Sequence, residues 1–442
     1  MTVHLAITKR DTQLPLTRGL GEWFFALFLL AGYYKADPRL AFIQTHIDLT
    51  LLFLISSFLV FLDRLLRNPF AQRVPIGFVK VAAFFLLLAA CLSGGLLITQ
   101  SEGYGLDKTL RFIVVTGWAF FGTAFLITDY LSLRRFSWAV VIISTMMAID
   151  ALLNYPGVGK VSFVTALGSN YIALARASGF GLLATLAFLL PTERRLLAKL
   201  CLWVVAILQT LAALSAGARG PVLALAVSLL CFFALSVRGF PHLKVERFSW
   251  RLGMVLFIAL VLIGTVGQEI FSTLFFRTQL LMTYLGESAV TRLHLYEEAF
   301  RLWASSPVWG VGTGGFAMAV TGSALVREYP HNIILELGAE IGLLGVLFFV
   351  AMICVAFGIG FAVLKKSTRI ARVTARYLLI AGCFALWNAM VSGDINDNRM
   401  LFTLVGLLSC TQRFQASIAA KGIVGQLRHS LSATNRLKEV QG

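Results

Sequence analysis

Long apolar segments separated by short polar ones dominate the chain. A helix needs about 20 mostly apolar residues to cross the hydrocarbon core of a bilayer, so the pattern predicts twelve transmembrane helices. The expected spans are 20–34, 43–62, 76–98, 110–131, 136–153, 171–190, 196–215, 220–237, 249–267, 333–363, 377–392 and 399–412. The tenth is long enough to tilt or to project beyond the bilayer. The sequence therefore predicts an all-α, polytopic membrane protein, with residues 1–442 forming one membrane-embedded domain.

The basic residues indicate how this bundle is oriented. If the N-terminus lies inside, the segments on the cytoplasmic side hold 25 Lys and Arg residues, and those on the opposite side hold 11. Cytoplasmic loops of membrane proteins usually carry such an excess. An even number of spans also places the C-terminus inside, where residues 413–442 form a basic tail. We therefore expect both termini in the cytoplasm.

Composition excludes several classes of protein. The chain is 58% hydrophobic and 13% charged, with a mean hydropathy of +0.83, whereas a soluble domain carries about 25% charged residues. A cytosolic enzyme, a disordered chain and a disulfide-rich secreted module are therefore excluded. The net charge of +17 does not indicate a nucleic-acid partner, because most basic residues lie in short loops. The six cysteines lie in apolar segments without a CxxC pair, so we expect neither a disulfide framework nor a metal site from them.

One loop is much longer than the others. Residues 268–332 separate the ninth and tenth spans on the outer face, and long structured loops are usually functional. Within this loop the periodicity predicts a helix over 288–304, with Ser288 as its N-cap. Arg301 is expected to form an ion pair with Glu297, four positions before it on one face, or with Glu298. The predicted apolar stripe of the helix is Val290, Leu293, Tyr296, Phe300 and Trp303.

Arginines on the outer face are candidates for binding an anion. Arg219 opens the eighth span, and the following Gly220 and Pro221 leave room beside its guanidinium. Arg292 lies in the first turn of the predicted loop helix, where the helix dipole favours an acid. The alternative for both is a charge that reaches lipid headgroups or solvent. Arg176, near the outer end of the sixth span, is expected to reach the same cavity. Two or three convergent guanidiniums would bind a pyrophosphate in bidentate fashion.

A histidine and several acidic residues complete the candidate chemistry. His331 lies between Pro330 and Asn332 just before the tenth span, and its imidazole can accept a proton near neutral pH. A structural role is the usual alternative for a single histidine. Glu336 follows at the outer end of a membrane helix, where a carboxylate is costly unless it has a partner or faces a cavity. We expect it to orient His331 or to bind an arginine.

Two further patterns are weaker. The glycine-rich run 310–315 has no preceding strand, so a flexible turn is favoured over an anion-binding nest. Asp394, Asn396 and Asp397 lie between the last two spans, but they form neither a DxD pattern nor a histidine cluster. We therefore expect no metal site.

The order of these residues resembles the O-antigen ligase family, which shares a superfamily with O-antigen polymerases. The resemblance is strong over roughly residues 200–350 and otherwise concerns topology. Its most specific part is Pro330-His331-Asn332, followed by a Leu-Glu-Leu helix containing Glu336. The remaining parts are the Arg-Gly pair that opens the eighth span and a run through Arg292, Trp303, Pro307, Gly310, Gly312, Gly314 and Gly342. Ser169-Asn170-Tyr171 departs from the family, since many relatives have an Asn-Pro-Asn-like motif there.

The resemblance implies a specific reaction. It implies a metal-independent, cofactor-free, inverting glycosyltransferase of the membrane-embedded C type in the bacterial inner membrane. Its donor would be an undecaprenyl-pyrophosphate-linked O-antigen, and a hydroxyl of lipid A–core would attack at the periplasmic face. The family's two essential arginines and one histidine match Arg219, Arg292 and His331. Arg176, Glu336 and Asn332 are further candidates for binding substrate, and membrane lipids are the other expected partners.

Two alternatives remain open from the sequence. An O-antigen polymerase would need the same pyrophosphate site and would differ only in its acceptor. A secondary transporter also fits twelve spans, but transporters usually contain two related halves with polar, broken helices at mid-membrane. No such repeat is visible in this sequence, and its polar residues collect at one face.

Overall fold

The computed structural model describes residues 17–67, 74–157, 160, 162–238, 244–245, 271–283, 287–323 and 325–419. The expected all-α class is confirmed: the regular elements of these residues are helices, apart from a two-residue antiparallel ladder of β1 (Val237–Arg238) and β2 (Lys244–Val245). The helices before the long loop are α1 (Thr17–Tyr34), α2 (Ala41–Gln44), α3 (Leu49–Arg67), α4 (Ile76–Gly95), α5 (Glu102–Arg111), α6 (Gly117–Leu126), α7 (Tyr130–Leu153), α8 (Tyr171–Ala184), α9 (Leu190–Thr192), α10 (Leu196–Ser215) and α11 (Arg219–Ala234). The later helices are α14 (Ser272–Thr283), α15 (Glu287–Ser305), α16 (Gly315–Thr321), α17 (Ile333–Lys366), α18 (Arg369–Ala389) and α19 (Arg399–Ser409).

Eleven of the expected spans coincide with described helices. Among the described residues, eight helices are long and apolar enough to cross a membrane, and α1, α11 and α19 contain shorter apolar stretches. π-Helical segments join α5 to α6 (Phe112–Thr116) and α8 to α9 (Thr185–Leu189), so each pair forms one span. The expected span 249–267 lies outside the described residues, so the total of twelve stays a prediction. The chain is an integral membrane protein.

The second span begins later than expected. The apolar pattern predicts residues 43–62, but α3 begins at Leu49. Asp48 causes this shift, because its carboxylate accepts hydrogen bonds from the backbone N–H groups of Thr50 (2.7 Å) and Leu51 (3.1 Å). Such a carboxylate satisfies donors that the first helical turn leaves unpaired. Residues 43–47 therefore belong to α2 and the turn that follows it.

Helix α8 lies at the centre of the bundle. Of its most apolar window, 94% is buried, against 17% for α3 and 28% for α10. It packs against α7, α10, α11 and α18. Gly179 and Gly181 permit this close approach, because a Cβ at either position would collide with Phe384 or Ser144. The exposed apolar side chains of α3, α4 and α10 are typical of helices that face lipid.

The tenth span is broken rather than merely long. At Gly342, φ is 65° and ψ is −161°, so α17 consists of two helical pieces, 333–341 and 343–366. The glycine-rich run fills the break: Val311 and Gly312 donate from their backbone amides to the carbonyl oxygens of Ala339 (2.8 Å) and Glu340 (2.9 Å). The run is therefore a packed turn that fixes the first piece of α17, and these amides are occupied by protein carbonyls.

Helix α15 matches the predicted range, but its buried face differs from the predicted stripe. Val290, Leu293 and Phe300 are 50%, 47% and 63% exposed. The residues that pack against Phe316 and Ala339 are instead Leu295, Ala299 and Leu302. The helix has two apolar faces, and periodicity alone could not tell which one meets the bundle. Of the two expected partners of Arg301, the structure has Glu298, whose carboxylate lies 2.6 Å from the guanidinium.

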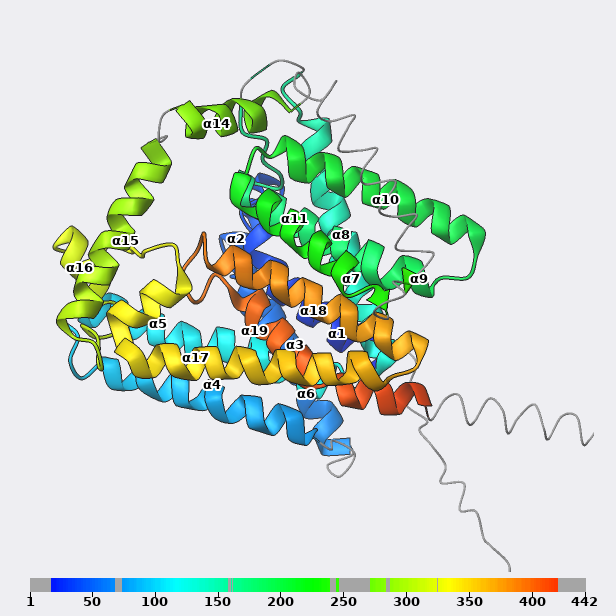
Figure 1. Cartoon of the computed structure of the whole chain (residues 1–442), viewed down its shortest axis with the longest axis horizontal. Helices are drawn as coiled ribbons and strands as arrows, with labels where there is room; N and C mark the ends of the chain where they lie inside the picture. Colours follow the sequence, from blue (N-terminus) through cyan, green and yellow to red (C-terminus); the bar gives the residue numbers. More distant parts are fainter. Residues whose placement is uncertain are drawn as a thin grey trace, which may run out of the picture.

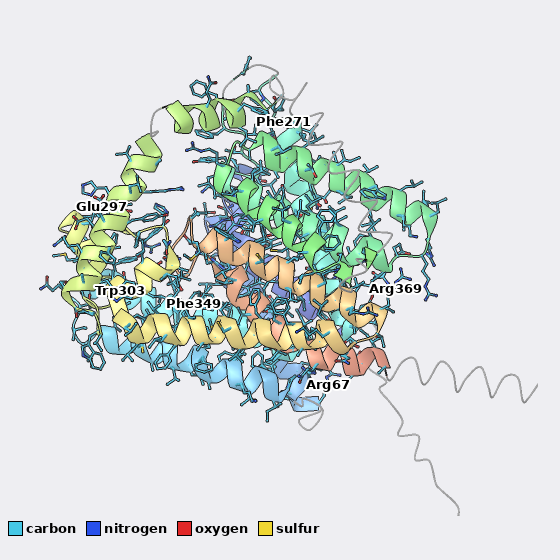
Figure 2. All side chains as sticks on the ribbon, viewed as in Figure 1. Arg67, Phe271, Glu297, Trp303, Phe349 and Arg369 are labelled. Atoms are coloured by element: carbon cyan, nitrogen blue, oxygen red, sulfur yellow. The ribbon has the colours of Figure 1, made fainter. Side chains whose placement is uncertain are left out.

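The helices of the long loop lie at one end of the bundle. Figure 1 shows α15 and α16 beyond the left-hand ends of α4 and α17. Trp303 contacts Gly338 of α17 there, and Figure 2 shows it at the opposite end of the molecule from Arg67 and Arg369. Helices α8, α11, α17 and α19 begin at this end, and α18 ends there.

Candidate active site

Two adjoining cavities lie where these helix ends meet. The larger, of about 330 Å³, is bordered by Arg176, His331 and Arg399 among others. The smaller, of about 40 Å³, is bordered by Arg219 and Arg292. Ile172 and Ser392 border both. The structure therefore brings the two predicted arginines together and places the predicted histidine in the neighbouring cavity.

Arg292 reaches this place from the buried face of α15. It precedes Leu295 by three positions and Ala299 by seven, so all three lie on the same side of the helix. Leu295 and Ala299 are buried, whereas the neighbouring His294 is exposed. Packing of this face against the bundle directs the Arg292 side chain into the cavity. A merely solvated arginine would lie on the other side, with His294 and Glu297.

Arg219 is positioned by a tight turn at the start of α11. The preceding Gly217 has φ of +70°, in the left-handed region that favours glycine. Gly220 comes next, where a Cβ would stand 3.1 Å from Val391 on the loop after α18. The small side chains on both sides of Arg219 thus let the chain turn sharply beside that loop. Its guanidinium borders the cavity at a helix N-terminus, which also favours anions.

His331 has an unusual backbone and an available nitrogen. Its φ is +59°, which is uncommon for a non-glycine residue and is typical of functional sites. The ring packs edge-on against Tyr329 with centroids 4.6 Å apart, and its buried Nδ1 has no hydrogen-bond partner within the described residues. Burial, followed by the positive charges of Arg292 and Arg176, lowers the pKa of His331 to about 4. The imidazole is therefore neutral at pH 7 and can accept a proton.

Arg176 is a buried cation at the wall of the larger cavity. It lies on α8 and is 7% exposed. Its guanidinium donates to the carbonyl oxygens of Asn388 (3.0 Å) and Ser392 (2.7 Å), and to the side-chain oxygen of Asn388 (3.3 Å). Within the described part of the chain it forms no ion pair. The carboxylate of Asp397 borders the same cavity and interacts with Arg176 through space, but it forms no direct ion pair with it in the described residues.

Arg399 is a second, partly buried cation at this cavity, and the sequence analysis missed it as a site residue. It begins α19, and its Nη1 has no hydrogen-bond partner among the described atoms. Asp397 borders the same cavity but is 45% exposed. The sequence signal was present, since Arg399 follows the acidic segment at the outer end of a span. Without the fold, however, nothing separates it from a charge at the lipid headgroups.

Glu336 and Asn332 have protein partners. The Glu336 carboxylate borders neither cavity and pairs with the buried Lys108 of α5 at 2.6 Å, rather than with His331 or an arginine. Lys108 also pairs with Glu340 at 2.7 Å. The Asn332 side-chain oxygen accepts from the backbone amides of Ile334 (3.0 Å) and Leu335 (3.1 Å), which caps α17. Both side chains therefore fix the helix that follows His331.

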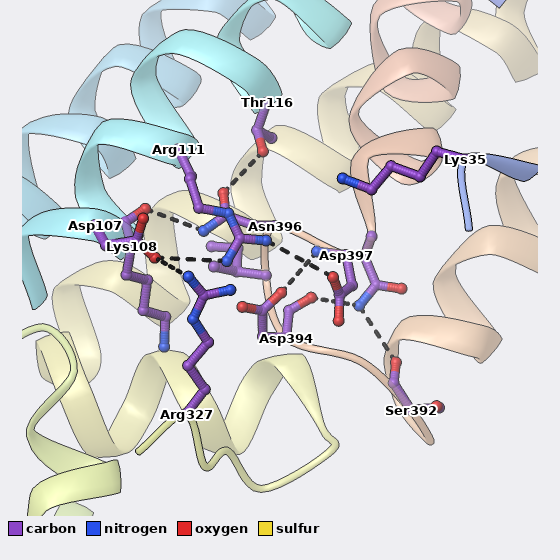
Figure 3. A network of polar contacts seen from close by, with 12 residues as sticks. Lys35, Asp107, Lys108, Arg111, Thr116, Arg327, Ser392, Asp394, Asn396 and Asp397 are labelled. Carbon is purple, nitrogen blue, oxygen red and sulfur yellow. Dashed lines mark hydrogen bonds and ion pairs between the residues drawn. The ribbon is translucent and has the colours of Figure 1, made fainter. Parts of the chain in front are cut away.

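The acidic segment between α18 and α19 is held by polar contacts (Figure 3). Asn396 donates to the carbonyl oxygen of Lys108 (3.0 Å) and accepts from Thr116 (2.9 Å). The Asp394 carboxylate accepts from the amide of Asp397 (2.7 Å). Across the described ranges, no group of three or more His, Cys, Asp and Glu side chains is arranged to hold a metal ion. The segment fixes the wall of the cavity, and its side chains are already engaged.

The comparison with known proteins concerns the part of the chain that contributes most of this site. Residues 204–350, which include Arg219, Arg292 and His331, match the family model for O-antigen ligases. The matched residues make up about a third of the chain, and over this part the chain is similar to that family. No curated protein matches the chain.

Proposed function

We propose that this protein is an O-antigen ligase of the bacterial inner membrane. It transfers a glycan from undecaprenyl pyrophosphate to a hydroxyl of lipid A–core at the periplasmic face. The observation that carries the proposal is the convergence of Arg219 and Arg292 on one cavity. His331 borders the adjoining cavity, and its neutral Nδ1 has no hydrogen-bond partner among the described residues. A diphosphate and a proton acceptor are the two things that this transfer requires.

Binding of the donor falls to the arginines. Guanidiniums bind phosphate oxygens in bidentate fashion. The small cavity beside Arg219 and Arg292 adjoins the larger one, which Arg176 and Arg399 border. As the bond between the anomeric carbon and the pyrophosphate oxygen breaks, negative charge grows on the leaving diphosphate. Fixed positive charges placed there stabilise the transition state without reorganising. In this role the arginines supply the positive charge that a metal ion supplies in many other transferases.

Activation of the acceptor falls to His331. Its Nδ1 takes the proton of the lipid A–core hydroxyl while the oxygen forms a bond to the anomeric carbon. Attack from the face opposite the departing pyrophosphate inverts the configuration at that carbon. Without bound donor His331 is a weak base, because burial and, after it, the positive charges of Arg292 and Arg176 lower its pKa. A bound diphosphate offsets these positive charges, so the imidazole becomes more basic when the donor is in place.

The test is transfer by the purified full-length protein in detergent, with an undecaprenyl-pyrophosphate-linked glycan as donor and no nucleotide. The proposal expects glycan on lipid A–core when that acceptor is supplied. Elongation of a second polyprenyl-linked glycan, with no product on lipid A–core, would instead identify a polymerase. A deletion strain gives a matching readout: loss of a ligase leaves long glycan on the carrier lipid, whereas loss of a polymerase leaves single repeat units on the core.

A further inference from the structure

A large cavity lies at the end of the bundle opposite the candidate active site. Its volume is about 870 Å³. The cations on its wall are Arg194, Lys199 and Arg369, from the turn after α9, from α10 and from the start of α18. Helix α18 begins at Arg369 beside this cavity and ends at Ala389. Asn388 near its end and Ser392 just after it accept hydrogen bonds from Arg176 at the candidate active site. At about 1.5 Å per residue, its 21 residues separate the two cavities by about 30 Å. Figure 2 shows Arg369 at that far end.

The cations of this cavity are not paired with acidic side chains in the part of the chain that the structure describes. Within the described ranges, Arg194, Lys199 and Arg369 form no ion pair. The one acidic residue on the wall is Glu193. Its carboxylate already pairs with Arg134 at 2.8 Å and accepts from the backbone amides of Arg194 (2.8 Å) and Arg195 (3.1 Å). The cavity therefore has an excess of positive charge.

Apolar side chains form much of the remaining wall. Pro191, Ile370, Val373 and Ile418 border the same space as the three cations. A site for a free inorganic anion needs charge and hydrogen-bond donors but gains nothing from such a lining. An amphipathic molecule with a phosphate and attached hydrocarbon uses both parts of the wall. A cavity of this size also exceeds what a single phosphate fills.

The C-terminal tail is a poor occupant on grounds of charge. The described chain reaches the cavity at Ile418 and Ala419, and residues 420–442 follow. That segment contains four basic residues and one acidic residue, Glu439. A segment with excess positive charge is repelled by a cavity of the same sign. An anion of different origin is therefore the better match.

We propose that this cavity binds the headgroup of an anionic phospholipid, with the phosphate between Arg194, Lys199 and Arg369. Basic pockets between membrane helices on the cytoplasmic side bind anionic lipid headgroups in general, through electrostatic attraction. The site joins the turn after α9 to the starts of α10 and α18, so a bound lipid ties these helices together. The proposal does not depend on the reaction at the other end of the bundle.

The experiment compares retained lipid between two charge-matched variants of the full-length protein. The test variant carries R194Q, K199Q and R369Q, and the control carries R67Q, R195Q and K365Q, which lie outside the cavity wall. Each protein is delipidated in detergent and titrated with cardiolipin or with phosphatidylcholine. Bound lipid is counted by native mass spectrometry, and inorganic phosphate serves as a third titrant.

We expect the unmodified protein and the control variant to retain cardiolipin in preference to phosphatidylcholine. The test variant should bind cardiolipin about 100-fold more weakly, from roughly fivefold for each cation removed. Equal weakening in both variants would overturn the proposal, because it would mean diffuse attraction by the whole basic surface. Displacement of cardiolipin by millimolar phosphate would overturn it as well, because the site would then be specific for a free anion. A test variant that does not fold, judged by its loss of a cooperative thermal transition, is replaced by R369Q and K199Q singly, each expected to weaken binding about fivefold.

Discussion

Lys108, Glu336 and Glu340 form a buried cluster of charges. Substituting Lys108 by methionine should destabilise the protein more than any other single change in this cluster. The Lys108 ammonium lies 2.6 Å from Glu336 and 2.7 Å from Glu340, and all three side chains are 1% exposed. At an effective dielectric constant of about 20, each contact corresponds to about 6 kcal/mol of attraction, before the cost of desolvation. Because methionine has a similar shape without the charge, two buried carboxylates would remain unpaired.

The net cost follows from measured cases of the same kind. Removing one partner of a buried ion pair costs about 3–5 kcal/mol. For a chain of 442 residues this corresponds to a fall in Tm of about 3–5 °C. Glu340→Gln should cost much less, because one carboxylate and one ammonium remain as a pair. Changing Lys108, Glu336 and Glu340 together to Met, Gln and Gln should restore most of the loss, since no unpaired charge remains.

Thermal unfolding in one detergent, followed by tryptophan fluorescence, measures these differences. Lys35→Met is the matched control, because Lys35 pairs with Asp48 at 3.3 Å but is 43% exposed. Exposed pairs contribute about 0–1 kcal/mol, so its Tm should change little. A Lys108→Met protein that unfolds within 1 °C of the unmodified protein, or a larger loss for Glu340→Gln, would refute the reasoning.

Three further predictions concern the site and the break in α17. The pKa of His331 is about 4, below its ordinary value, so the folded protein binds fewer protons than the unfolded one between about pH 4 and 6.5. Histidine NMR should therefore show neutral His331 down to about pH 4, Arg292→Gln should raise its pKa, and an ordinary value near 6.5 would contradict the burial. Transfer should persist in EDTA, because the arginines bind the diphosphate, and strict loss on chelation would point to a metal at Asp394 and Asp397. Gly342→Ala should destabilise the protein by at least about 1–3 kcal/mol, because alanine is strained at φ 65°, ψ −161° and its Cβ would collide with the Val308 carbonyl. The control in the same thermal assay is Gly358→Ala, where a Cβ meets no atom within 4 Å.

The sequence predicts the membrane helices well because their signal is local. A run of about 20 apolar residues has few alternatives in a bilayer, so α4, α8 and α10 begin at the expected residues. The exact start of α3 depends on the side chain of Asp48, which caps the helix. The break at Gly342 depends on hydrogen bonds that the backbone amides of Val311 and Gly312 donate to the first piece of α17. The capping aspartate is visible in the sequence but easily missed, whereas the hydrogen bonds at the break join residues about 30 positions apart and are not visible in a local pattern.

The candidate site is predicted only in part, for a related reason. The sequence singles out Arg219, Arg292 and His331 by their unusual local settings, and the structure gathers them at one end of the bundle. The sequence does not reveal that the buried face of α15 is the one that carries Arg292, because the helix has two apolar faces and either could pack against the bundle. Nor does it pair Lys108 with Glu340, which is 232 residues away. Such pairings depend on the packing of whole helices.

The central claim is that Arg219 and Arg292 jointly bind the diphosphate of a polyprenyl-linked donor. The most direct measurement is the rate of glycan transfer to lipid A–core by purified Arg219→Ala and Arg292→Ala, beside Arg301→Ala. Arg301 lies on the same helix as Arg292 but is 65% exposed and pairs with Glu298. We predict that each of the first two variants loses transfer by at least about 100-fold while keeping the Tm of the unmodified protein, and that Arg301→Ala stays active. Near-normal transfer by Arg219→Ala or Arg292→Ala would contradict the account.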